Sequence, residues 1–141
     1  EIERMKKIYT PLQIAFATLF GGPVAAIYLL QKNFRILGNK SAANKTTLFG
    51  LILTVILVII VYFSPDEYQI PEYIGYVFLI IYISIPACIA DSHQLKREDI
   101  LKSDTYIFQP NEKILGVAFV SWYVLILIIG IPAYFFTFIT T

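Results

Sequence analysis

The chain has 141 residues, of which 57% are hydrophobic and 15% are charged, and its mean hydropathy is +0.70. Soluble globular domains carry about 25% charged residues, so this composition excludes an ordinary soluble domain. The formal net charge is +1 and the basic residues are scattered over short segments, which gives no surface for nucleic acid. Cys88 is the only cysteine, which excludes an intrachain disulfide, and we expect it to be a small packing residue.

Long uncharged segments predict membrane-spanning helices. Asp, Glu, Lys, Arg and His are missing from four of them, residues 12–31, 46–63, 73–90 and 114–141. A helix of about 17 to 25 such residues crosses a hydrocarbon core of about 30 Å. We therefore predict an all-α integral membrane protein that forms a single polytopic membrane domain over residues 1–141. Its predicted parts are a broken helical segment over 10–38, three transmembrane helices over 41–63, 71–90 and 110–138, and a cytoplasmic loop over 91–109.

The broken segment opens with a helix-start signal. Thr10 can cap the helix, Pro11 suits its first position, and Gln13 can reach back to the cap, so the three form a capping box. Upstream, Met5 is typical of a native start, and residues 1–4 are expected to derive from a tag or a longer precursor. A cleaved signal peptide is rejected, because its apolar core would hold a proline and be very short.

The same segment is interrupted at Gly21, Gly22 and Pro23. From Pro11 to this break the helix is about 15 Å long, which is half a bilayer. Two geometries fit: a kinked helix that spans the membrane over about 31 Å, or a re-entrant hairpin that turns back at the break. Gly38 is predicted to end the segment.

Charged residues favour one of these geometries. Loops 32–47 and 91–113 together hold eight Lys and Arg residues, whereas 64–72 holds acidic residues and no basic one. The positive-inside rule therefore places the first two loops in the cytoplasm and the C-terminus in the periplasm. A spanning first helix would put the basic residues near the N-terminus outside, whereas a re-entrant hairpin keeps them in the cytoplasm. The charges thus favour the hairpin.

Residues 91–103, within the second basic loop, are predicted to extend the third helix near the membrane surface. Ile100 and Leu101 are apolar, and Glu98 and Lys102 have the spacing of a favourable helical ion pair. A solvated linker and an interfacial helix that docks on lipid or a partner both fit this pattern.

The sequence offers no evident site for chemistry. The four uncharged segments hold no carboxylate, cation or imidazole, which counts against a proton-coupled transporter. His93 lies near Asp91 in a charged loop and is interpreted as a solvated residue rather than a metal ligand. Ser121 has no base near it in the sequence. We predict no catalytic residue, no cofactor and no metal ion.

Small residues predict close helix packing. They recur every four positions on the second helix, at Ala42, Thr46, Gly50 and Thr54. Such a stripe lets a neighbouring helix approach closely, either within one protomer or in a self-association face. Three tyrosines are expected deeper in the membrane, where their hydroxyls would need partners inside the protein: Tyr82, Tyr123 and Tyr134.

The first 40 residues carry a distinctive pattern. It consists of Tyr9-Thr10-Pro11-x-Gln13, Gly21-Gly22-Pro23-x-Ala25, Tyr28-Leu29, Asn33-Phe34 and Leu37-Gly38-Asn39. This pattern resembles that of a family of small uncharacterised bacterial inner-membrane proteins. Members often have a Ser-Trp-Trp-like start of the last helix, whereas this chain has Gln109-Pro110-Asn111 there. The resemblance implies a bacterial cytoplasmic (inner) membrane and brings no activity, cofactor or catalytic residue.

Two functions from different classes fit these observations. The first is a non-enzymatic accessory or scaffolding subunit that works in the lipid bilayer by packing its helices against a second copy or a membrane-protein partner. The alternative is a small oligomeric channel or membrane-permeabilising effector, because an irregular backbone at membrane depth is tolerated where it lines water. An enzyme or a substrate carrier fits less well.

Overall fold

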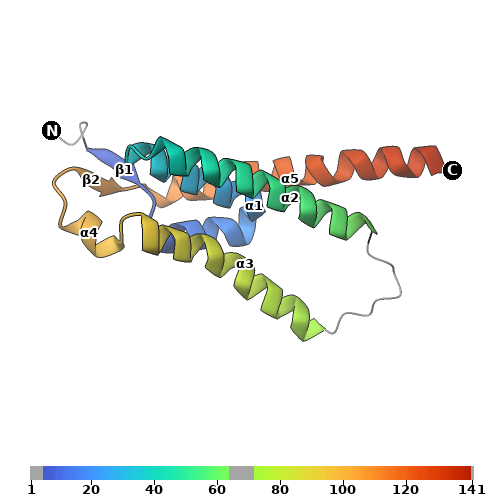
Figure 1. Ribbon diagram of the computed structural model, residues 1–141, viewed down its shortest axis with the longest axis horizontal. Helices are drawn as coiled ribbons and strands as arrows, with labels where there is room; N and C mark the ends of the chain where they lie inside the picture. Colours follow the sequence, from blue (N-terminus) through green and yellow to red (C-terminus); the bar gives the residue numbers. More distant parts are fainter. Residues whose placement is uncertain (1–4, 64–71, 141) are drawn as a thin grey trace.

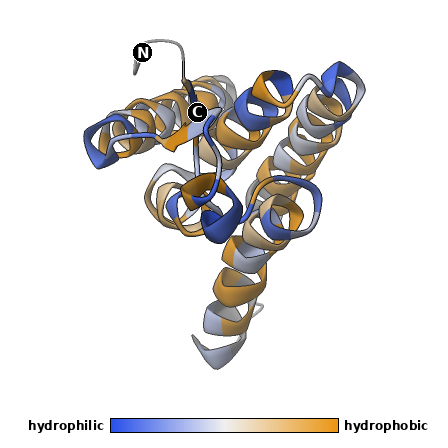
Figure 2. Cartoon of the chain, turned by 90° about the vertical axis from the view of Figure 1, so that its left-hand side faces the viewer, coloured by the Kyte–Doolittle hydropathy of each residue, from blue (hydrophilic) through white to orange (hydrophobic). Residues whose placement is uncertain are grey.

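The computed structural model describes residues 5–63 and 72–140, and this part of the chain is mostly helical. The elements in order are β1 (Lys6–Ile8), α1 (Pro11–Ile36), α2 (Lys40–Phe63), α3 (Glu72–His93), α4 (Arg97–Leu101), β2 (Tyr106–Phe108) and α5 (Asn111–Thr140). Figure 1 shows β1, β2 and α4 gathered at one end of an elongated helical bundle, with the end of α5 at the other. Figure 2 looks onto the first end, where hydrophilic segments collect.

Three helical segments are long and apolar enough to cross a membrane: Pro11–Ile36, Lys40–Ile60 and Asn111–Phe135. Within the described residues α3 contributes the shorter apolar stretch Leu79–His93. The helices predicted over 41–63, 71–90 and 110–138 correspond to α2, α3 and α5, with ends that differ by three residues or fewer. The predicted acidic loop lies outside the described residues, apart from its last residue, Glu72.

α1 folds back on itself at Gly22, where the backbone leaves helical geometry with φ 66° and ψ −159°. The Tyr9 N–H donates to Asn33 Oδ1 over 3.0 Å, although the two residues lie 24 apart in the sequence. A straight helix would separate them by about 36 Å, so a continuous helix does not fit this contact. α1 is therefore a hairpin of two arms, which we call the first arm (residues 11–21) and the second arm (residues 23–36).

Local signals fix both ends of the hairpin. Thr10 and Gln13 form the predicted capping box, with Gln13 N–H donating to Thr10 Oγ1 over 3.2 Å and Thr10 N–H donating to Gln13 Oε1 over 3.0 Å. At the other end Gly38 has φ 81°, a left-handed conformation that ends the helix after Ile36. The predicted start and stop of the segment are both confirmed.

The prediction of a helical fold is confirmed for most of the described chain, but it missed a short parallel ribbon that β1 and β2 form at the polar end of the bundle. Its register pairs Lys6 with Tyr106 and Ile8 with Phe108. The ribbon is closed by a bond from the Lys6 N–H to the Thr105 carbonyl and by one from the Gln109 N–H to the Ile8 carbonyl, at 2.9 and 3.0 Å. The paired residues lie 100 positions apart in the sequence, so this pairing holds the N-terminal segment beside the connection between α4 and α5.

The predicted helical extension over 91–103 is also interrupted. α3 ends at His93, and the separate α4 follows three residues later. The break lets α4 turn toward β2, where the Arg97 guanidinium lies 5.9 Å from the centre of the Phe108 ring. The basic loop is thus folded against the ribbon rather than extended along the surface.

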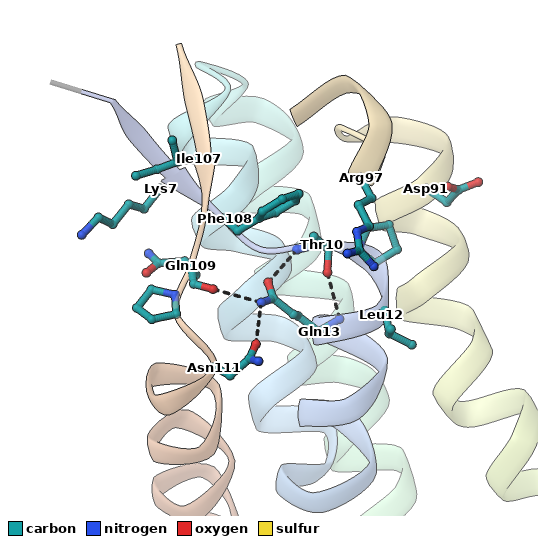
Figure 3. Close-up of a pocket in the computed structure, with 12 residues that line it drawn as sticks. Lys7, Thr10, Leu12, Gln13, Asp91, Arg97, Ile107, Phe108, Gln109 and Asn111 are labelled. Atoms are coloured by element: carbon teal, nitrogen blue, oxygen red, sulfur yellow. Dashed lines mark hydrogen bonds between the residues drawn. The ribbon is translucent and has the colours of Figure 1, made fainter. Parts of the chain in front are cut away.

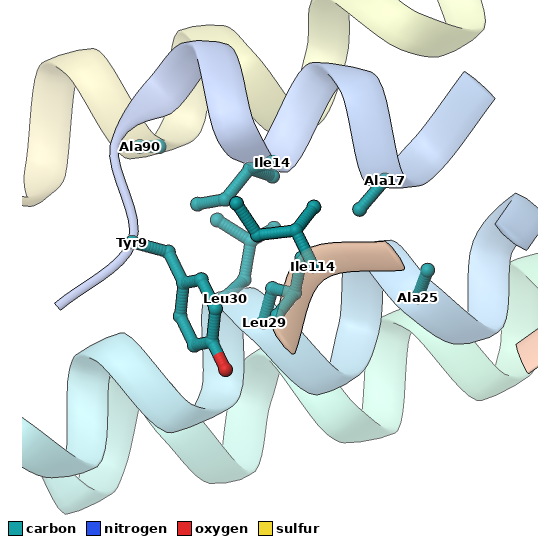
Figure 4. Packing of buried hydrophobic residues seen from close by; sticks show 8 residues of the cluster. All are labelled: Tyr9, Ile14, Ala17, Ala25, Leu29, Leu30, Ala90 and Ile114. Atoms are coloured by element: carbon teal, nitrogen blue, oxygen red, sulfur yellow. The ribbon is translucent and has the colours of Figure 1, made fainter. Parts of the chain in front are cut away.

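The hairpin is the core of the molecule. α2, α3 and α5 each pack mainly against α1 and make at most marginal contact with one another in the described part of the chain. In the α1 span 39% of the residues are buried, against 11% and 17% in the α2 and α5 spans. The buried cluster in Figure 4 joins both arms to α3 and α5, through Tyr9, Ile14, Ala17, Ala25, Leu29, Leu30, Ala90 and Ile114.

Substitution of Gly22 tests the turn. Only glycine adopts this combination of φ and ψ without strain, so Gly22→Ala should lower the free energy of unfolding by about 1–3 kcal/mol. Gly116→Ala is the matched control, because its added Cβ meets nothing within 4 Å and its φ is negative. That variant should be neutral or slightly stabilising. The free energy of unfolding of each variant is measured in mixed micelles with increasing dodecyl sulfate. Equal changes in the two variants would contradict the fold-back at Gly22.

Candidate functional site

The turn of the hairpin is closely packed against α5. A Cβ added at Gly21 would lie 2.7 Å from Ala25 Cβ and 2.9 Å from Ala118 Cα, so only glycine lets α5 approach here. A Cβ at Gly22 would lie 3.0 Å from Leu125 Cδ2. Pro23 begins the second arm, a position where the missing N–H would have no helical partner. The predicted break is thus a turn that α5 covers on one side, with Gly22 and Pro23 partly buried.

One polar atom lies next to this turn without a partner. The Tyr82 hydroxyl of α3 is buried and has no hydrogen-bond partner among the described residues. It lies 3.8 Å from the position that a Cβ at Gly22 would take. The other two deep tyrosines, Tyr123 and Tyr134, are 60% and 71% exposed. We therefore find no polar seam formed by these three residues within the described chain.

Asn33 ties three segments together near the polar end. Its side chain is fully buried. Oδ1 accepts the Tyr9 N–H over 3.0 Å, and Nδ2 donates to the Tyr9 carbonyl over 2.7 Å. The same Nδ2 donates to Gln94 Oε1 over 2.8 Å, and Gln94 Nε2 donates to the Leu30 carbonyl over 3.1 Å. One amide thus joins the residue after β1, the second arm and the residue after α3 in a single network, which we call the Asn33 clamp.

Tyr9 is part of this arrangement through its ring as well as its backbone. The Lys32 ammonium lies 5.7 Å from the centre of the Tyr9 ring and 5.4 Å from that of Tyr28. Burial raises the pKa of the Tyr9 phenol above its ordinary value, and the nearby Lys32 charge partly offsets this. The phenol is therefore neutral across the physiological range and acts as a packing group.

Gln13 forms a second junction, shown in Figure 3. Besides capping α1, its Nε2 donates to the Gln109 carbonyl and to Asn111 Oδ1, both over 3.0 Å. The starts of α1 and α5 are thereby joined side by side, each just after a strand of the ribbon. Sequence reasoning identified the cap but missed this second role, because its partners lie almost 100 residues away.

The small-residue stripe of α2 faces the hairpin. A Cβ added at Gly50 would collide with the Ile27 side chain of the second arm, and Thr54 is buried. Ala42 and Thr46 are partly buried. Beside the stripe, Gln31 Nε2 donates to Thr47 Oγ1 over 2.7 Å. The stripe therefore packs within the protomer, as the first of the two interpretations expects, which leaves the opposite face of α2 exposed.

Groups that could carry chemistry are dispersed. No cluster of three His, Cys, Asp or Glu side chains that could hold a metal ion occurs among residues 5–63 and 72–140. Asp91 is paired with Lys96 at 3.5 Å, and His93 is exposed. Ser121 is buried in α5. Cys88 is exposed, so its expected packing role is wrong.

No family model, curated protein or solved structure matches the chain. The resemblance of the N-terminal pattern to a bacterial inner-membrane family therefore stays a prediction.

Removal of the Asn33 amide tests the clamp. Asn33→Leu keeps the volume but leaves the buried N–H and C=O of Tyr9 without partners, so it should lower the free energy of unfolding by about 3 kcal/mol or more. The control is Asn39→Leu, which removes an exposed cap of α2 whose Oδ1 accepts the Ala42 N–H, and it should cost only about 1 kcal/mol. The free energy of unfolding of each variant is measured in micelles. If Asn33→Leu and Asn39→Leu lower it equally, the clamp is refuted.

Proposed function

We propose that the chain is a non-enzymatic integral membrane protein that serves as an accessory or scaffolding subunit, through helix packing with a second copy or a membrane-protein partner. The observation that carries the proposal is the half-length core. The turn of the hairpin lies beside Tyr82 and Leu125, near the middle of α3 and α5. Among the described residues, the buried core lies in the half of the bundle that holds the two arms.

The exposure of residues in the outer halves of α2 and α5 supports the proposed scaffold function. Beyond Thr54, every described residue of α2 up to Ile60 is exposed except Val58, which is partly buried. The corresponding part of α5 is exposed at Ile131, Tyr134 and Phe135, by 51%, 71% and 58%. Apolar surface on all sides of a helix requires lipid or another helix. A partner that packs between or beside these outer halves would complete the bundle.

The hairpin and the distribution of charges support one placement in the membrane. We infer that α1 is re-entrant, that α2, α3 and α5 cross, and that the loops at 32–47 and 91–113 face the cytoplasm of a bacterial cell. The pairing of β1 with β2 supports this orientation, because it holds the N-terminal segment beside the basic loop. The C-terminus then lies in the periplasm. The bacterial inner membrane itself rests on the resemblance alone.

Cysteine labelling tests the re-entrant placement. Met5→Cys and Ser41→Cys flank α1 without changing any charge, and each is made in a Cys88→Ala background. In oriented vesicles, a membrane-impermeant maleimide should label both from the same side and Thr140→Cys from the opposite side. Labelling of Met5→Cys and Ser41→Cys from opposite sides would show that α1 crosses the membrane.

A second candidate function is a small oligomeric channel. The observation that favours it is the unpartnered Tyr82 hydroxyl beside the turn, since a buried hydroxyl at membrane depth is stabilised by water or an ion. The close apolar packing of Gly21 and Gly22 against α5 favours the scaffold instead.

Association and ion flux measured on the same liposomes separate the two candidates. The scaffold predicts self-association, or co-purification with one partner, without ion flux. Gly130→Leu should weaken the association several-fold without unfolding the protomer, because Gly130 lies in the outer half of α5 and a Cβ there meets nothing within 4 Å. Gly116→Leu, equally open but in the inner half, is the control. Flux that Tyr82→Phe or Gly22→Leu abolishes would support the channel and refute the scaffold.

A further inference from the structure

We propose that the chain holds one anionic phospholipid in a groove between the first arm of α1 and α5, with the lipid headgroup at the polar end and an acyl chain along the helices. This inference rests on the proposed membrane insertion. It assigns a ligand to a surface that the scaffold function does not need.

The polar end of this groove is a cavity of about 800 Å³ beside the start of α1. Figure 3 shows Lys7 and Arg97 on opposite sides of Gln13, so two cations flank the mouth. The acidic residue at the cavity is Asp91, whose carboxylate is already paired with Lys96 at 3.5 Å. The mouth therefore carries net positive charge, which suits a phosphate.

Gln109, one of the residues that line this cavity, has a polar atom without a partner in the described part of the chain. Gln109 is 5% exposed, and its Oε1 is buried with no hydrogen-bond partner among the described residues. If the Gln109 amide turned toward the cavity, a hydroxyl or glycerol group carried next to a phosphate would supply the missing donor.

The cavity continues downward into two apolar ones. A cavity of about 280 Å³ shares Leu12, Gln13 and Asn111 with the first. A third, of about 340 Å³, shares Phe16 and Leu115 with the second. Together they follow one face of the first arm and the facing side of α5, from the polar mouth to the level of the turn.

The walls and length of this groove fit an acyl chain. The third cavity is lined by Phe16, Phe20, Ala118, Phe119 and Trp122 together with Leu115, and the rings of Phe16 and Phe20 lie 4.8 Å apart. The first arm is about 15 Å long, which is the depth of one leaflet of a hydrocarbon core. A polar, cationic mouth above an apolar groove of this depth matches a single lipid of that leaflet.

Trp122 gives a direct readout, because it is the only tryptophan and lines the deep end of the groove. The full chain is placed in phosphatidylcholine nanodiscs that contain a small fixed fraction of acyl-brominated phosphatidylglycerol or acyl-brominated phosphatidylcholine. The brominated phosphatidylglycerol should quench Trp122 fluorescence more strongly at the same fraction. Lys7→Ala and Arg97→Ala should each lower the relative binding constant for phosphatidylglycerol about fivefold.

Lys45→Ala is the matched control, because it removes one exposed positive charge from α2, outside the groove. It should leave the preference for phosphatidylglycerol unchanged. Equal quenching by the two brominated lipids would overturn the lipid site and leave the membrane insertion intact. The same conclusion would follow if Lys45→Ala lowered the preference for phosphatidylglycerol as much as Lys7→Ala and Arg97→Ala do. Absence of quenching by both lipids would overturn the insertion of α5 and the lipid site together.

Discussion

The two hydrogen bonds between the Asn33 side chain and the Tyr9 backbone are the interaction on which the rest of the structure depends. Both residues are almost fully buried, so the backbone N–H and C=O of Tyr9 have no access to water. Each such group left unpaired would cost about 1–3 kcal/mol. By offering a donor and an acceptor together, Asn33 lets the chain enter the bundle one residue beyond β1. The start of the first arm is thereby fixed beside the end of the second.

A hairpin closed in this way determines how the other helices are arranged. Because both arms of α1 occupy the centre, α2, α3 and α5 each find apolar partners on it and need none on one another. The same geometry limits the core to the half of the bundle that contains the arms. It also leaves a groove along the first arm and α5, which Gln13 joins at their starts and Gly21 packs together at the turn. The fold-back of α1 thus accounts for both the half-length core and the groove.

Features set by local sequence could be predicted, and those set by distant pairing could not. The Thr10 cap, the break at Gly22 and the stop at Gly38 each depend on neighbouring residues, and the helix bounds follow from hydropathy. The ribbon was missed because each strand has three residues and its partner lies about 100 positions away. Asn33 is notable in the sequence only as part of the N-terminal pattern, because its partners Tyr9 and Gln94 lie 24 and 61 residues away. The cavity was invisible for the same reason, since distant segments converge to form it.

The environment of the turn bears on which function the fold serves. Backbone outside a helix is tolerated at membrane depth either when protein covers it or when it lines water. Here Ala118 and Leu125 of α5 lie directly against Gly21 and Gly22, so protein covers one side. Among the described residues outside α1, the Tyr82 hydroxyl on α3 is the only polar atom within 4 Å of a Cβ placed at Gly22, and one hydroxyl does not make a continuous path for ions. The packing therefore favours a structural role for the turn: it brings both arms back to the polar end, where the clamp and the cationic mouth are assembled.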